Sequence, residues 1–182
     1  CHFLSVARFQ HPKDYKTLIN SFLQITETTS SKLTLIGDGP LLPDMQRIVF
    51  NRRACDRIIF LGYQASEDID YSAYDVFVLS SLSEGLPISI LEAMSSSLPV
   101  LASDVGGVNE AVVDNINGFL FPAKDVDRLS TLMTLVASDP NLRSRLGSAS
   151  FSLHQKKFSL SSMNTLTTDF LSMIISSSVH LS

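Results

Sequence analysis

Two glutamates, Glu84 and Glu92, are separated by seven residues in the segment SEGLPISILEAM, which follows an apolar run. Pro87 suits the first position of a helix, so the segment predicts a helix that begins near residue 87. Free N–H groups and the dipole make a helix start an anion site, and Gly85 lets a ligand approach the backbone. Carboxylates accept hydrogen bonds from vicinal hydroxyls. The segment therefore suits an anion at the helix start and a polyol at the carboxylates. Taken alone, acidic residues near a helix start more often simply favour its dipole, but that alternative does not explain why Glu84, Gly85 and Pro87 occur together at a strand end.

Two cations, Arg8 and Lys13, follow an apolar run at residues 2–6. An Arg guanidinium offers a fork of donors to a phosphate, and Lys offers a point charge. In a parallel sheet both would lie at the edge where the helix at residue 87 begins. For Lys13 an ordinary solvated surface charge is an equal alternative, because exposed lysine is so common.

Two glycine-containing segments are less specific. Gly106 and Gly107 lie between a predicted strand and a predicted helix, where they permit close backbone approach to a ligand or form a plain tight turn. The segment Gly37-Asp38-Gly39 has Leu42 where the dinucleotide-binding fingerprint needs its third glycine, so we interpret it as a turn.

Short apolar runs alternate with amphipathic stretches along the chain. Strands are predicted at residues 2–6, 33–36, 58–62, 76–79, 99–102 and 119–121. Helices are predicted at about 14–26, 41–52 and 66–74, then from about residue 87, and then at about 107–113. The chain from residue 126 to the end is predicted to be helical, with a closing helix at about 159–176. This order predicts an α/β fold, a doubly wound parallel sheet of about six strands with helices on both faces, in one domain over residues 1–182. Continuously apolar strands suit a sheet buried on both sides, whose site lies at the carboxyl ends of the strands.

Composition narrows the function classes. The 182 residues carry a formal net charge of -4, with 45% hydrophobic and 18% charged residues, which suits a globular domain and not a nucleic-acid surface. Cys1 and Cys55 form no disulfide framework, so a reduced cytoplasmic setting is expected. The sequence shows no signal peptide and no apolar run of about 20 residues. An apolar strand that starts at residue 2 indicates that an upstream part is absent.

The chain resembles the C-terminal domain of a family-4 retaining glycosyltransferase, which has the GT-B fold of two Rossmann-like halves. The resemblance covers nearly the whole chain and rests on segments such as SVARFQHPKDYKTLINSF, LTLIGDGPLLPDMQ and RIIFLGY. Its most specific part is the paired-glutamate motif, Glu84 and Glu92, with its flanks. Ala7 stands where the family often has Gly, and the Ser-rich tail departs more from the family pattern.

The resemblance implies three catalytic residues. Arg8 and Lys13 would hold the donor diphosphate, and Glu84 would bind hydroxyls of the donor sugar. As the nucleotide departs, negative charge grows on the diphosphate, and the two cations and the helix start could stabilise it in place of a metal ion. Neither a metal nor another cofactor is therefore expected.

The resemblance also implies a set of donor-binding residues. Glu92 would bind the ribose hydroxyls. The backbone at Gly85 and Leu86 would lie against the sugar and the phosphates. Gly62 and Tyr63 would lie near the base.

The expected activity is that of a hexosyltransferase. It moves a sugar from a nucleotide-diphosphate sugar to a glycan or lipid-linked acceptor with retention of configuration, as in polysaccharide biosynthesis. This chain would supply the donor half and be inactive alone, because the N-terminal acceptor domain is missing. The full-length protein would be cytoplasmic, and peripheral association with the inner face of a membrane would be compatible with this expectation. Two alternatives stay open: a nucleotide-sugar epimerase of the same fold, and a non-catalytic nucleotide-binding module.

Overall fold

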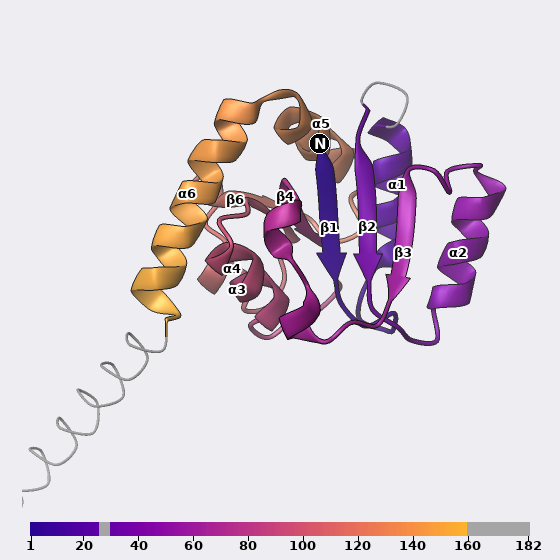
Figure 1. Ribbon diagram of the computed structural model, residues 1–182, viewed down its shortest axis with the longest axis horizontal. Helices are drawn as coiled ribbons and strands as arrows, with labels where there is room; N and C mark the ends of the chain where they lie inside the picture. Colours follow the sequence, from indigo (N-terminus) through magenta and orange to yellow (C-terminus); the bar gives the residue numbers. More distant parts are fainter. Residues whose placement is uncertain (26–29, 160–182) are drawn as a thin grey trace, which may run out of the picture.

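A computed structural model describes residues 1–25 and 30–159 of the chain (Figure 1). Its centre is a six-stranded sheet in the order β3-β2-β1-β4-β5-β6, and every neighbouring pair of strands is parallel. The strands are β1 (His2–Val6), β2 (Lys32–Ile36), β3 (Ile58–Gly62), β4 (Val76–Leu79), β5 (Val100–Ser103) and β6 (Gly118–Phe121). The doubly wound parallel sheet predicted from the alternating pattern is confirmed.

Helices cover both faces of the sheet. They are α1 (Tyr15–Ile25), α2 (Leu42–Asn51), α3 (Ile88–Ser95), α4 (Val108–Ala111), α5 (Val126–Ser138) and α6 (Pro140–Lys157). Two short 3-10 helices, η1 (Ser66–Asp68) and η2 (Tyr71–Ala73), lie in the crossover from β3 to β4. One hydrophobic core joins the sheet to α1, α2 and α5, and a second joins the other face to η2, α3 and α4.

The central strand β4 shows why the strands read as continuous apolar runs. Val76 and Val78 belong to the core beneath α1 and α5, whereas Phe77 and Leu79 belong to the core beneath α3. All four side chains are buried. Because successive side chains of a strand point to opposite faces, a strand covered on both sides needs an apolar residue at each position.

Two predicted helices differ from the structure, and a third begins within one residue of its predicted start. The stretch 66–74 forms two 3-10 turns, because the Asp70 carboxylate accepts from the Ser72 backbone N–H and starts a second turn. Pro87 has extended backbone angles and precedes α3, which begins one residue later than predicted. The helix at 107–113 shortens to α4. Apart from Ser159, the predicted closing helix lies outside the described residues.

Candidate functional site

Three loops meet at the carboxyl edge of the sheet. The loop after β1 is joined to the loop after β4 by two backbone hydrogen bonds, from Asp14 N–H to the Ser80 carbonyl and from Leu82 N–H to the Pro12 carbonyl, each 2.9 Å. The loop after β5 joins them through Gly107 N–H, which donates to the Glu84 carbonyl at 3.2 Å. Main-chain contacts therefore fix the loops that carry the predicted cations and the first glutamate.

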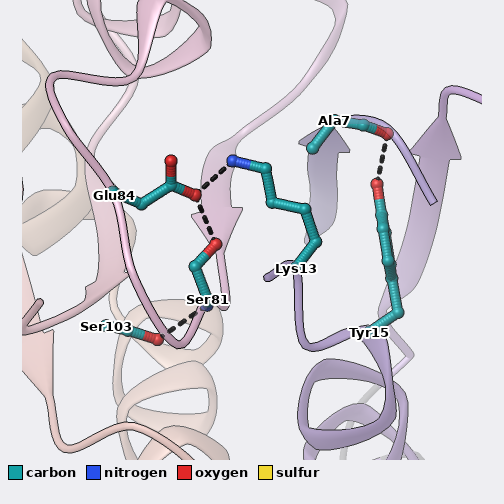
Figure 2. A network of polar contacts seen from close by, with 6 residues as sticks. All are labelled: Ala7, Lys13, Tyr15, Ser81, Glu84 and Ser103. Carbon is teal, nitrogen blue, oxygen red and sulfur yellow. Dashed lines mark hydrogen bonds and ion pairs between the residues drawn. The ribbon is translucent and has the colours of Figure 1, made fainter. Parts of the chain in front are cut away.

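Lys13 and Glu84 form an ion pair between two of these loops (Figure 2). Their side chains are 18% and 10% exposed, so Lys13 is not the solvated surface charge that its sequence alone allowed. The Ser81 hydroxyl donates to the same carboxylate oxygen of Glu84, and the Ser81 N–H donates to the Ser103 hydroxyl at 3.0 Å. A cation and a hydroxyl thus hold Glu84 in one orientation, in surroundings where electrostatic interactions are stronger than in water.

The two glycines after β5 pack against the backbone that carries Glu84. Gly106 has a φ of +53°, and a Cβ there would lie 1.9 Å from the Glu84 carbonyl oxygen. A Cβ on Gly107 would lie 2.8 Å from the Gly85 carbonyl oxygen. The close approach predicted for this pair is therefore made to protein backbone. The Cβ direction of Gly85 itself is open, with nothing within 4 Å.

A second carboxylate, that of Glu92, is held differently. Its Oε1 accepts from the Ser66 hydroxyl, and its Oε2 accepts from the Tyr71 hydroxyl at 2.7 Å. Burial raises the pKa of Tyr71 above its usual value near 10, and the hydrogen bond and negative charge of Glu92 raise it further, so the phenol stays a proton donor. Ser66 and Tyr71 were absent from the predicted site residues, because they lie 26 and 21 positions before Glu92 in the chain.

Arg8 lies beside a groove at the ends of β1, β2 and β3. The groove has a volume of about 680 Å³. It is lined by Val6, Ala7, Arg8, Ile36, Gly37, Asp38, Gly39, Tyr63 and Gln64. Tyr63 is 76% exposed, and the carbonyl of the preceding Gly62 accepts from Gly37 N–H at 2.8 Å. The Gly37-Asp38-Gly39 segment is thus a turn that forms one wall of this groove.

The predicted residues fall into three groups at this edge. Lys13 and Glu84 are in direct contact, Arg8 and Tyr63 line the groove, and Glu92 is held by the β3–β4 crossover. Within residues 1–25 and 30–159, no hydrogen bond or ion pair links Arg8 or Glu92 to the Lys13–Glu84 pair. The exposed Leu86 lies just before α3, whose first turn has no side-chain cap.

Two Asp-x-Asp spacings, at residues 68–70 and 125–127, have the compact arrangement that can hold a divalent ion. In the structure Asp70 binds the backbone N–H of Ser72, and Asp125 binds that of Arg128 at the start of α5. In the part of the chain that the structure describes, no three His, Cys, Asp or Glu side chains are grouped to hold a metal ion. None of the described helices is long and apolar enough to cross a membrane.

Comparison with known sequences identifies the family. The model of the family "Glycosyl transferases group 1" matches residues 2–152. The chain belongs to this family. It is 30% identical over 161 residues to the alpha-D-kanosaminyltransferase of Streptomyces kanamyceticus, an alignment that covers 87% of this chain and 42% of that protein. The chain therefore spans less than half the length of this relative.

Solved structures agree in fold with this assignment. HepE of Anabaena, crystallised with UDP and glucose, superposes with a TM-score of 0.84 at 22% identity, over 94% of this chain and 48% of that one. The C-terminal domain of LpcC, a group 1 glycosyl transferase from Francisella tularensis, superposes with a TM-score of 0.77 at 23% identity and covers 87% of both chains. At these identities the likeness concerns the fold.

Proposed function

We propose that this chain is the donor-binding half of a retaining glycosyltransferase that takes a nucleoside-diphosphate sugar without a metal ion. The observation that carries the proposal is the Lys13–Glu84 pair, which is mostly buried beside the uncapped start of α3. The pair lies at the carboxyl ends of the strands, where parallel sheets bind their ligands, and Lys13 and Ser81 contact only one of the two Glu84 carboxylate oxygens. Membership in a family of transferases favours this function over an epimerase.

The diphosphate would bind to positive charge from two sources. Lys13 supplies an ammonium with little exposure to water, and the first N–H groups of α3 supply partial positive charge. Arg8, beside the neighbouring groove, can turn its exposed guanidinium to the same phosphates. Charge that develops on the leaving diphosphate would then meet fixed donors, which is the main way that enzymes lower the barrier of such a step.

The sugar and the nucleoside would occupy the flanks of the diphosphate. Glu84 has a second carboxylate oxygen that does not contact Lys13 or Ser81, and this oxygen is available to sugar hydroxyls. Glu92 would take the ribose hydroxyls, and Gly62 and Tyr63 would lie near the base at the groove. The open Cβ direction of Gly85 suits close approach of the ligand to that backbone.

The acceptor, a glycan or a lipid-linked glycan, would be bound by a second half. Two observations support this division: the chain spans 42% of the kanosaminyltransferase, and it superposes on a separately crystallised C-terminal domain. Holding two reactants in a near-attack geometry is worth about 7–11 kcal/mol of the barrier, so a donor half alone would bind without transferring. Retention of configuration and peripheral attachment to the inner face of a membrane belong to the same proposal.

Calorimetric titration of the 182-residue chain tests the donor assignment. UDP, GDP and ADP are titrated first, and then the glucose form of each nucleotide. We expect one of the three to bind, with its sugar form bound at least as tightly. Failure of all three nucleotides and of their sugar forms to bind would exclude a donor half.

An assay of sugar transfer tests the second part. The 182-residue chain is compared with a longer chain that joins it to an acceptor half, with the same donor and acceptor. Transfer with retained configuration by the longer chain alone supports the proposal. Robust transfer by the 182 residues alone would contradict the division into halves, and inversion would contradict the retaining mechanism.

A further inference from the structure

The Glu92 carboxylate lies at the meeting point of two segments that are distant in sequence. Glu92 projects from α3, whereas the two hydroxyls that bind it come from η1 and η2 in the β3–β4 crossover. Ser66 binds one carboxylate oxygen and Tyr71 binds the other. The crossover therefore fixes both the position and the rotation of the carboxylate plane.

An ionised carboxylate offers about four lone-pair directions, two on each oxygen. Ser66 and Tyr71 occupy one direction on each oxygen, so each oxygen keeps one direction for a further hydrogen bond. Two adjacent acceptors match the two adjacent hydroxyls of a ribose ring, and a deoxyribose supplies only one of these hydroxyls. A carboxylate free to rotate would show this match only part of the time.

We propose that Tyr71 is a positioning residue that holds the Glu92 carboxylate ready for a vicinal diol, so that the site selects ribonucleoside over deoxyribonucleoside diphosphates. The proposal rests on the donor site proposed above, since it assigns the ribose to Glu92. Ser66 performs the same task on the other oxygen, with less constraint because it is exposed.

Tyr71 is well placed for this task. Its residue is 5% exposed and belongs to the core beneath α3, and its ring packs against Phe77 of β4 with centroids 6.3 Å apart. The ring therefore cannot swing away, and the hydroxyl stays within 2.7 Å of Glu92. Because burial and Glu92 both raise the pKa of Tyr71, the hydroxyl keeps its proton throughout the physiological range.

The experiment compares Tyr71→Phe with a matched control. Phenylalanine retains the ring against Phe77 and removes only the hydroxyl. Tyr74→Phe removes a hydroxyl from the same crossover at the opposite, amino edge of the sheet, where the Tyr74 ring packs against His2. UDP and 2′-deoxy-UDP are titrated into the wild-type chain and both variants, and the corresponding GDP and ADP pairs are titrated in the same way.

We expect wild type and Tyr74→Phe to prefer the ribonucleotide. In Tyr71→Phe, ribonucleotide affinity should fall about tenfold while deoxynucleotide affinity changes little, so the preference narrows by the same factor. Ser66→Ala should narrow it in the same direction by a smaller factor, and it serves as a second test if Tyr71→Phe folds poorly. An equal loss of affinity for the ribonucleotide and the deoxynucleotide in Tyr71→Phe would overturn the positioning role. A preference for the ribonucleotide that is unchanged in both Tyr71→Phe and Ser66→Ala would also overturn it. If wild type binds none of the three pairs, the donor site itself fails, and this inference fails with it.

Discussion

The two glutamates of the motif occupy opposite kinds of surroundings. Glu84 lies in a loop, where the ammonium of Lys13 neutralises it and the Ser81 hydroxyl donates a hydrogen bond to it. Glu92 sits inside α3 and meets two uncharged donors, Ser66 and Tyr71. One carboxylate is therefore held mainly by charge and the other by hydroxyl geometry.

In the proposed complex, this difference would let one motif bind two parts of the ligand. In a lysine–glutamate pair beside a helix start, the lysine can bind a charged diphosphate and the glutamate can bind a sugar. A carboxylate fixed by neutral donors keeps its negative charge uncompensated, which suits hydrogen bonding to a neutral diol. The variants below are arranged to separate the two modes.

Removing the cation should have the largest effect. Lys13→Met deletes the ammonium near the proposed diphosphate and leaves Glu84 with little water and no cation. We expect affinity for the best-bound nucleoside diphosphate to fall about 10- to 100-fold, because hydrogen bonds to charged groups contribute about 1.5–3 kcal/mol. Calorimetry measures it, with Lys16→Met as the control, because Lys16 is an exposed residue in the first turn of α1. An unchanged affinity in Lys13→Met would remove Lys13 from the site.

A side chain that clashes with the Glu84 main chain should have the next largest effect. Gly106→Ala places a Cβ against the Glu84 carbonyl in a left-handed conformation, so we expect a loss of about 2 kcal/mol in the free energy of unfolding. Urea denaturation measures it. Gly85→Ala is the control, because the Cβ direction there is open. Equal stability of the two variants would show that the loop after β5 does not support Glu84.

Neutralising each glutamate should separate sugar from nucleoside. Glu92→Gln should lower the affinity for a nucleoside diphosphate and for its sugar form alike, by about tenfold, because the ribose is common to both. Glu84→Gln should lower only the affinity for the sugar form, since the second carboxylate oxygen of Glu84 faces the sugar in the proposed complex. Titrations of UDP and UDP-glucose measure both. The reverse pattern would mean that the two roles are exchanged.

Raising the pH should act on the Glu92 side through Tyr71. A folded pKa above the unfolded value near 10 means that Tyr71 contributes stability below pH 10, which is lost as the pH rises further. We expect unfolding free energy to fall by about 1 kcal/mol per such tyrosine between pH 9 and pH 11. Tyr15, whose pKa burial also raises, adds a similar loss. Urea denaturation at both pH values should show a smaller loss in Tyr71→Phe, and an equal loss would contradict the shift.

A chelator should have no effect at all. If Lys13, Arg8 and the start of α3 supply the positive charge, nucleoside-diphosphate affinity should be the same with and without EDTA. The titration is repeated after dialysis, with added magnesium as the positive arm. Binding that disappears with EDTA and returns with magnesium would contradict metal independence.

The sequence was sufficient to predict the fold. Apolar runs such as 76–79, spaced by amphipathic stretches, are consistent with only a few packing arrangements, and the parallel sheet buried on both faces is the simplest of them. Glu84, Gly85 and Pro87 also predicted a site, because their types are unusual together at a strand end. These signals are local, so they can be recognised without coordinates.

The tertiary structure alone decided what each of these residues contacts. The partners of Glu92 lie in a crossover that was predicted as one helix, and Gly106 packs against the Glu84 backbone from another loop. Lys13 was as consistent with a surface charge as with a site, until the loop after β1 joined the loop after β4. Local preferences and hydrophobic periodicity extend over a few residues, whereas these contacts depend on how strands distant in sequence are ordered in the sheet.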